Sequence, residues 1–211
     1  MLVLAGITGW MTTAPLQAQP VAQLDVNASV GWTHVEHADF ASYDNWDHGV
    51  SHGAVGLGWY WTDHLKTDVE LNVNSRAQFY GYEALPVNGR TAYRGTRYNV
   101  GAAALGVTQV VQFFRNAWLH PYLGLGVDLC REAVEQEIEP LQAYDEAARQ
   151  VVQLEPARRV GPTVSYEPRP FIAAGAKAYV TQRLFMRTDL RVGVGHPARG
   201  IVARMGMGID F

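Results

Sequence analysis

GIVARMGMGIDF, residues Gly200 to Phe211, is the stretch of sequence that decides the fold. Its residues alternate between two unlike faces with a period of two, which predicts a β-strand. One face is apolar throughout and consists of Ile201, Ala203, Met205, Met207, Ile209 and Phe211. The other face carries Val202, Arg204, Gly206, Gly208 and Asp210. Because a strand buried on both sides would be apolar on both, this strand is expected to separate two different environments.

The bulk composition narrows the class of protein. A chain of 211 residues is long enough for one domain with a substantial core. Its net charge of -3 and pI near 6.1 provide no basic surface for nucleic acid. No apolar run approaches the roughly 18 residues that a membrane-spanning helix needs. The single Cys130 forms no internal disulfide. Any membrane crossing would therefore use strands.

Residues 1–18, MLVLAGITGWMTTAPLQA, resemble a secretory signal peptide. They contain a short apolar segment, a Thr-Thr-Ala-Pro break, and Ala18 as the cleavage residue. No Lys or Arg precedes the apolar segment, and Leu16 is bulky for its position, so the natural start is expected to lie upstream. Residues 19–211 are then expected to form a single exported domain.

Seven further stretches repeat the two-faced pattern of the terminal strand. They are residues 23–37, 53–63, 66–79, 96–113, 121–129, 171–181 and 186–195. Eight strands of roughly ten residues each have the length and even number of a small membrane-spanning barrel. Residues 86–95 are expected to form a loop. Residues 131–170 are the longest predicted loop, within which either a short helix or a protruding hairpin could form.

Three features indicate that the apolar faces point outward into lipid. Glycines gather on the polar face beside large charged residues, as a crowded lumen requires. Short turns near residues 63, 116 and 182 alternate with mostly longer connections, which is typical of periplasmic turns and extracellular loops. Aromatic residues fall near strand ends as in interfacial girdles, namely Trp59, Trp61 and Phe211 at one rim and Trp32, Phe79 and Tyr98 toward the other. The alternative is a soluble lipocalin-like barrel whose apolar face lines a ligand cavity.

The end of the chain resembles the assembly signal of bacterial outer-membrane β-barrels, matched here by Arg204, Gly206, Ile209 and Phe211. With the strand pattern over residues 23–211, the chain is similar to the small eight-stranded families typified by OmpA, OmpX and OmpW. The resemblance implies an all-β, transmembrane, antiparallel up-and-down barrel in the bacterial outer membrane. It also implies membrane lipid, lipopolysaccharide and the barrel assembly machinery as partners, with no cofactor.

Charges of alternating sign occupy the expected inward faces. They are Lys66, Asp68, Glu70, Arg76, Arg97, Lys177, Arg187, Asp189, Arg191 and Arg204. Buried unpaired charge is costly, so these side chains are expected to pair across the lumen and fill it. An eight-stranded barrel is just wide enough for such a plug. The alternative is a passage for water or small solutes.

No residue pattern argues strongly for catalysis or for a metal. Asp68 and Glu70 share one face, as an acid–base pair requires, but basic neighbours suit them to ion pairs instead. The spacing of His34, His37, His48 and His52, near Asp39, Asp44 and Asp47, matches no compact zinc motif. Ser51 beside His52 is the nearest approach to the Ser–His arrangement of membrane-embedded deacylases, and eight strands are few for an omptin protease. The sequence thus favours a non-enzymatic barrel for envelope structure or surface interaction, with a solute conduit as the alternative.

Overall fold

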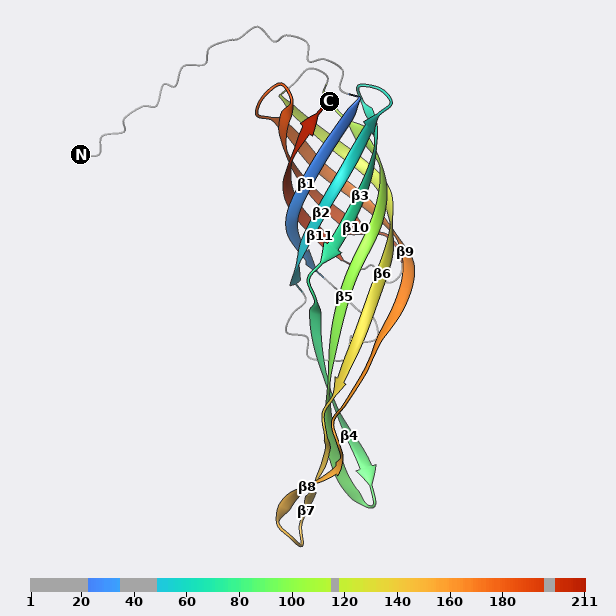
Figure 1. Cartoon of the computed structure of the whole chain (residues 1–211), viewed down its shortest axis with the longest axis vertical. Coiled ribbons are helices and arrows are strands. Elements are labelled where there is room, and N and C mark those ends of the chain that lie inside the picture. The colour runs from blue at the N-terminus through green and yellow to red at the C-terminus, as the bar shows by residue number, and fades with distance from the viewer. Residues whose placement is uncertain (1–22, 35–48, 115–117, 196–199) are drawn as a thin grey trace, which may run out of the picture.

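The computed structural model describes residues 23–34, 49–114, 118–195 and 200–211, and its regular elements are all strands (Figure 1). None of the described residues belongs to a helix long and apolar enough to cross a membrane. The strands are β1 (Leu24–His34), β2 (Gly49–Tyr60), β3 (Leu65–Asn74), β4 (Ala77–Val87), β5 (Arg90–Gln112), β6 (Leu119–Ile138), β7 (Leu141–Asp145), β8 (Gln150–Glu155), β9 (Arg158–Tyr179), β10 (Leu184–Gly193) and β11 (Ile201–Asp210).

Eight of the strands close into an antiparallel barrel. The order around it is β1, β2, β3, β5, β6, β9, β10, β11 and back to β1. The ring closes where β1 pairs with the terminal strand β11, from Asp25 opposite Asp210 to Thr33 opposite Val202. Closure leaves the barrel part of the sheet without open edges. The predicted all-β barrel of eight strands, built by pairing the terminal strand with the first, is confirmed.

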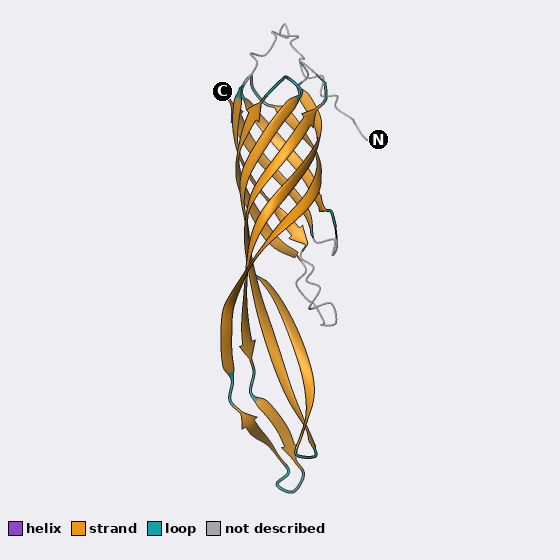
Figure 2. Ribbon diagram, turned by 90° about the vertical axis from the view of Figure 1, so that its right-hand side faces the viewer, coloured by secondary structure: helices purple, strands orange, loops and turns teal. Residues whose placement is uncertain are grey.

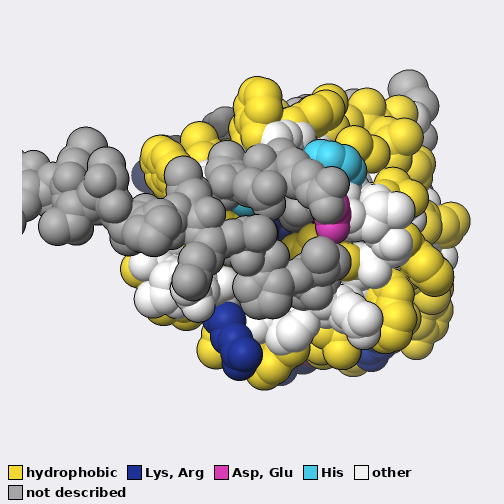
Figure 3. Space-filling view, turned by 90° about the horizontal axis from the view of Figure 1, so that it is seen from above, with side chains coloured by type: hydrophobic (Ala, Val, Ile, Leu, Met, Phe, Trp, Pro, Cys, Tyr) yellow, Lys and Arg dark blue, Asp and Glu magenta, His cyan; other side chains and the backbone are white. Residues whose placement is uncertain are grey.

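The apolar faces of the barrel strands point outward. Val30 and Leu125 are each 67% exposed, and Met205 is 61% exposed. Viewed along the barrel from the end that carries the termini, hydrophobic side chains lie around the periphery (Figure 3). Charged side chains of the same strands are buried inside, and Asp68 is fully inaccessible. The soluble-barrel alternative is wrong, because such a protein would hold its apolar side chains inside and its charges outside.

The face assignment was wrong for one barrel strand, β5. The pattern in residues 96–113 placed Tyr98, Val100 and Val110 outward, yet Val100 and Val110 are buried inside. The outward side chains are instead Leu105, Val107 and Val111. Both faces of β5 are apolar or small over residues 100–107, so alternation of hydrophobicity carries little information there.

The same sheet continues out of the barrel and forms an extension (Figures 1 and 2). It consists of β4, the first part of β5, the last part of β6 and the first part of β9, paired in that order. The predicted loop at 86–95 is wrong, because its residues form the end of β4, the start of β5 and a tight turn between them. Asn88 and Gly89 have φ values of 49° and 74°, the left-handed geometry that Asn-Gly favours in hairpin turns.

Residues 131–170 contain the protruding hairpin, one of the two alternatives left open by the sequence. β6 runs on to Ile138, β7 and β8 form the hairpin, and β9 begins at Arg158. Two small apolar clusters support the extension. Phe79 packs with Val50, Ala77 and Val100 near the barrel, and Ala92 packs with Leu141 and Ala143 near the tip.

The middle part of the extension carries ion pairs on its surface. Arg159 lies 3.1 Å from Glu135 and also pairs with Glu137, which Arg97 approaches to 3.6 Å. The hydrogen bond from Arg159 holds the pKa of Glu137 below its usual value. These exposed pairs link strands β5, β6 and β9.

Candidate functional site: the charged lumen and its outer vestibule

The lumen near the termini holds a cluster built on two lysines. Lys66 Nζ lies 2.7 Å from both Asp25 Oδ2 and Asp68 Oδ1. Lys177 Nζ lies 2.6 Å from Asp210 Oδ1 and donates to the Tyr60 hydroxyl at 2.7 Å. The same ammonium lies 3.7 Å from the centre of the Phe185 ring, a cation–π contact. This end of the lumen is therefore filled by side chains.

A second cluster, built on three arginines, fills the middle of the lumen. Arg187 lies 2.9 Å from Asp68, and Arg204 lies 2.6 Å from Asp189 and 2.9 Å from Glu70. Arg191 also pairs with Glu70, and its guanidinium stacks 4.5 Å from the Phe171 ring. Since Asp68 contacts both Lys66 and Arg187, the two clusters are continuous.

Together the two clusters form what we call the lumen network. It contains five cations, Lys66, Lys177, Arg187, Arg191 and Arg204, and five carboxylates, Asp25, Asp68, Glu70, Asp189 and Asp210. Every one of these ten residues is less than 10% exposed. Equal numbers of opposite charges in contact offset the large cost of removing each from water, whereas a missing partner would leave a buried charge uncompensated.

The structure brings eight of the ten predicted lumen charges together and excludes two. Arg76 and Arg97 are exposed, because the chain breaks its strand at Ser75–Arg76 and Arg97 lies on the outer face of the extension. Asp25 and Asp210 were missed, although their positions on the polar faces of the first and last strands signalled an inward direction. Tyr60 was missed as well, because an aromatic residue gives no such signal.

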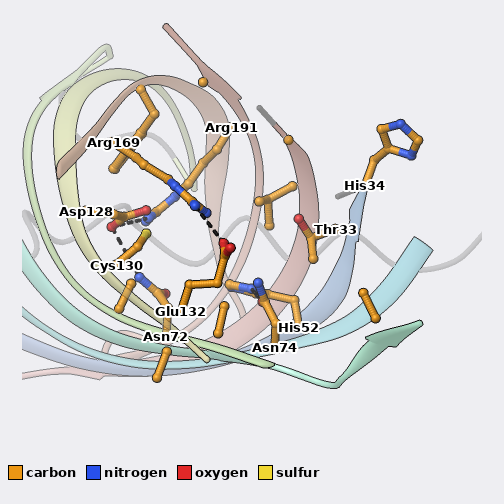
Figure 4. Close-up of a pocket in the computed structure, with 18 of the residues that line it drawn as sticks. Thr33, His34, His52, Asn72, Asn74, Asp128, Cys130, Glu132, Arg169 and Arg191 are labelled. Atoms are coloured by element: carbon orange, nitrogen blue, oxygen red, sulfur yellow. Dashed lines mark hydrogen bonds and ion pairs between the residues drawn. The ribbon is translucent and has the colours of Figure 1, made fainter. Parts of the chain in front are cut away.

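Between the lumen network and the extension lies a cavity of about 110 Å³ that we call the vestibule (Figure 4). Its polar lining includes His52, Asn72, Asp128, Glu132 and Arg169. Asn72 donates to Asp128 at 3.3 Å, and Arg169 lies 2.7 Å from Glu132. Arg191, at the end of the lumen network nearest the extension, lies 4.0 Å from Asp128 and forms part of the vestibule wall. Of these residues, Arg191 was predicted from the sequence as a lumen charge and His52 as a loop histidine.

The predicted girdle aromatics fall into two groups. Trp59, Trp61 and Phe211 are exposed at the rim near the termini, and Trp32 is exposed toward the opposite rim. The girdle prediction is wrong for Phe79, which is 1% exposed inside the base of the extension, and for Tyr98, which packs against the same cluster. Both lie beyond the break at Ser75–Arg76 or on the strand whose faces were reversed, which accounts for the error.

The residues that resemble an assembly signal occupy the strand that closes the barrel. Arg204 points into the lumen network, Ile209 is exposed on the outer face, and the Phe211 side chain is exposed at the rim. The Phe211 carbonyl accepts hydrogen bonds from the backbone N–H groups of Gln23 at 3.0 Å and Leu24 at 3.4 Å. Gly206 lies opposite Ser29 in the β1–β11 seam.

Ser51 and His52 lie on opposite faces of β2. His52 is buried in the lumen, where its Nδ1 lies 2.8 Å from Asn74 Oδ1, while Ser51 is exposed outside. Adjacent strand residues cannot converge on one substrate. His37 and His48, with Asp39, Asp44 and Asp47, lie outside the described residues. Within the described residues no three His, Cys, Asp or Glu side chains are placed to hold a metal ion.

No family model and no curated protein sequence matches the chain. Several solved structures, however, match the chain. Neisserial surface protein A matches with a TM-score of 0.56 and 13% sequence identity over 90% of this chain and 98% of that one. OprG from Pseudomonas aeruginosa matches with a TM-score of 0.47 and 9% identity over 92% and 99% of the two chains. The N-terminal barrel domain of Pseudomonas aeruginosa OprF gives 0.45 and 13% over 90% and 98%. The fold is that of small bacterial outer-membrane β-barrels.

Proposed function

We propose that this protein is a non-enzymatic outer-membrane barrel that anchors the extension at the cell surface and holds a closed lumen. The observation that carries the proposal is the lumen network, in which ten buried charges contact one another across the barrel. The apolar exterior suits membrane lipid, and the resemblance of the chain end to an assembly signal suits insertion by the barrel assembly machinery. Lipopolysaccharide would then surround the outer rim.

The extension supports a role in surface contact rather than in transport. The connections β3–β4–β5 and β6–β7–β8–β9 build it at one end of the barrel, whereas the opposite end has short turns at 61–64 and 180–183. In outer-membrane barrels the long connections face outward and the short turns face the periplasm. The extension would therefore project from the cell.

Planar-bilayer recording tests the closed lumen. Purified protein inserted at a known density should give no discrete conductance steps, because ion pairs occupy the lumen at the level of Glu70 and Arg204. A variant carrying both Glu70→Ala and Arg204→Ala, which removes one carboxylate and one cation and so keeps the network balanced in charge, should conduct measurably and serves as the positive control. Reproducible steps from the unaltered protein would favour a solute conduit instead.

Surface exposure of the extension is tested separately on whole cells. An epitope inserted between Asn88 and Gly89, at the tip of the β4–β5 hairpin, should be stained by antibody without permeabilisation. The same epitope inserted in the turn at residues 181–183 should be stained only after permeabilisation. Staining of only the epitope at residues 181–183 on intact cells would mean that the barrel has the opposite orientation in the membrane.

A further inference from the structure

The vestibule differs from the adjoining lumen network in its balance of positive and negative charges. Among the described residues, the network pairs five cations with five carboxylates, and Arg191 is already committed to Glu70. Of the described residues outside the network, Asp128 and Glu132 are the carboxylates that line the vestibule, and Arg169 is the cation that lines it. This part of the lumen is therefore richer in carboxylates than in cations.

Two buried side chains of the vestibule have polar atoms without a hydrogen-bond partner. Both His52, which is 7% exposed, and Asn72, which is 5% exposed, line the cavity. His52 Nε2 and Asn72 Oδ1 form no hydrogen bond with any residue that the structure describes. Leaving such buried atoms unsatisfied is unfavourable, so a ligand that satisfied them would be favoured.

Both of these atoms act as acceptors. The Nδ1 of His52 lies against the Asn74 amide oxygen, which can only accept, so Nδ1 carries the proton and Nε2 of the neutral ring presents a lone pair. Asn72 uses its amide nitrogen to donate to Asp128, which leaves its oxygen as an acceptor. The vestibule thus presents two neutral acceptors beside the carboxylates of Asp128 and Glu132 (Figure 4).

We infer that the vestibule binds a primary ammonium group, such as the head of a short alkylamine. Three N–H donors and a positive charge match two neutral acceptors and a carboxylate excess. A cavity of about 110 Å³ admits a head group with a few carbons but not a large solute. Apolar side chains that line the same cavity, including Val100, Ala102 and Phe171, suit the alkyl part. The adjoining lumen network would stop such a ligand from passing through the barrel.

Calorimetric titration of the full-length protein in detergent tests the site, at pH 8 and low salt. Butylamine should bind saturably. Two ligands of similar size isolate the chemistry: 1-butanol lacks the charge, and tetramethylammonium has the charge but no N–H donor. Both should bind at least tenfold more weakly. Absence of saturable heat with butylamine, or equal affinity for tetramethylammonium, would overturn the inference.

Variants locate the ligand within the protein. Asp128→Asn, which removes a vestibule charge, and His52→Phe, which removes an acceptor, should each weaken butylamine binding at least tenfold. Glu137→Gln removes an exposed carboxylate of the extension and should leave the affinity unchanged. Heat-modifiable gel mobility verifies that each variant is folded. Unaltered affinity in a folded Asp128→Asn or His52→Phe variant would place the amine elsewhere. These outcomes are independent of the conductance result.

Discussion

At the scale of single residues, Gly58 illustrates how tightly the lumen is filled. A Cβ built on Gly58 would lie 2.6 Å from Asp25 Oδ1 and 2.7 Å from Asp68 Oδ1, and Lys66 holds both carboxylates in place. Gly58→Ala should therefore lower the free energy of unfolding by about 1–3 kcal/mol, the usual cost of overpacking. Urea titration of the protein in lipid vesicles measures the loss.

Gly53, on the same strand, provides the matched control for this substitution. A Cβ on Gly53 meets no atom within 4 Å, so Gly53→Ala should leave stability unchanged or raise it slightly. Equal unfolding midpoints for the two variants would contradict the crowded lumen.

Alternation along the strands was enough to predict most of the buried charges. Lys66, Asp68 and Glu70 share one parity in a strand whose other face is apolar apart from Thr67, so their direction could be read directly. Which partner each charge contacts could not be read, because Glu70 meets Arg204 across 134 positions of sequence. The vestibule acceptors were not foreseen, since their unsatisfied state depends on neighbours from other strands.

At the scale of strands, the exterior of the barrel makes a quantitative prediction about lipid. Val69, on β3, is exposed on the apolar outer face. Val69→Arg should cost on the order of 2–4 kcal/mol if it lies near the bilayer midplane, and Leu190→Arg on β10 should behave alike. Val164→Arg, on the part of β9 that lies in the extension, is the control and should cost far less. Equal unfolding free energies for the Val69→Arg and Val164→Arg variants would refute the assigned faces.

The β7–β8 hairpin makes a prediction about pH. Backbone N–H groups of Ala148 and Ala147, with the Arg90 guanidinium, hold the pKa of Asp145 below its usual value. A lowered folded pKa means that the stabilisation is complete above the unfolded pKa of about 3.9 and disappears as the pH falls through the folded pKa. Carboxyl NMR shifts measured across a pH titration should show an Asp145 pKa below the usual value of an aspartate. An Asp145 pKa at or above its usual value would contradict these contacts.

The strands of the extension were the least predictable elements. The break at Ser75–Arg76 separates β3 from β4, and residues 66–79 looked like one strand because apolar residues keep odd positions across the break. Only the pairing of Ala77 with Val100 and of Val87 with Arg90 defines β4. The Asn88-Gly89 pair was the one local signal for this hairpin, and it lay within a stretch interpreted as a loop.

At the scale of the whole molecule, the seam between β1 and β11 predicts a difference between assembly and stability. The Phe211 side chain is 64% exposed, while the backbone of Phe211 supplies the hydrogen bonds to Gln23 and Leu24. Phe211→Ala keeps those bonds and should change the unfolding free energy by about 0.5 kcal/mol or less. If the aromatic ring is what the assembly machinery reads, the yield of inserted protein in cells should drop markedly. Normal yield would refute that role.

The continuity of β5, β6 and β9 determines how the protein responds to a pulling force. Each strand runs unbroken from the barrel wall into the extension, and β5 alone has 23 residues, about 75 Å at the rise of an extended strand. Hydrogen bonds between antiparallel strands lie perpendicular to the strand axis, so tension along the extension loads them in shear. Bonds loaded in shear share the load and break together rather than one after another. A partner attached near the tip would therefore be tethered mechanically through the membrane-embedded wall itself, without a compliant joint between them.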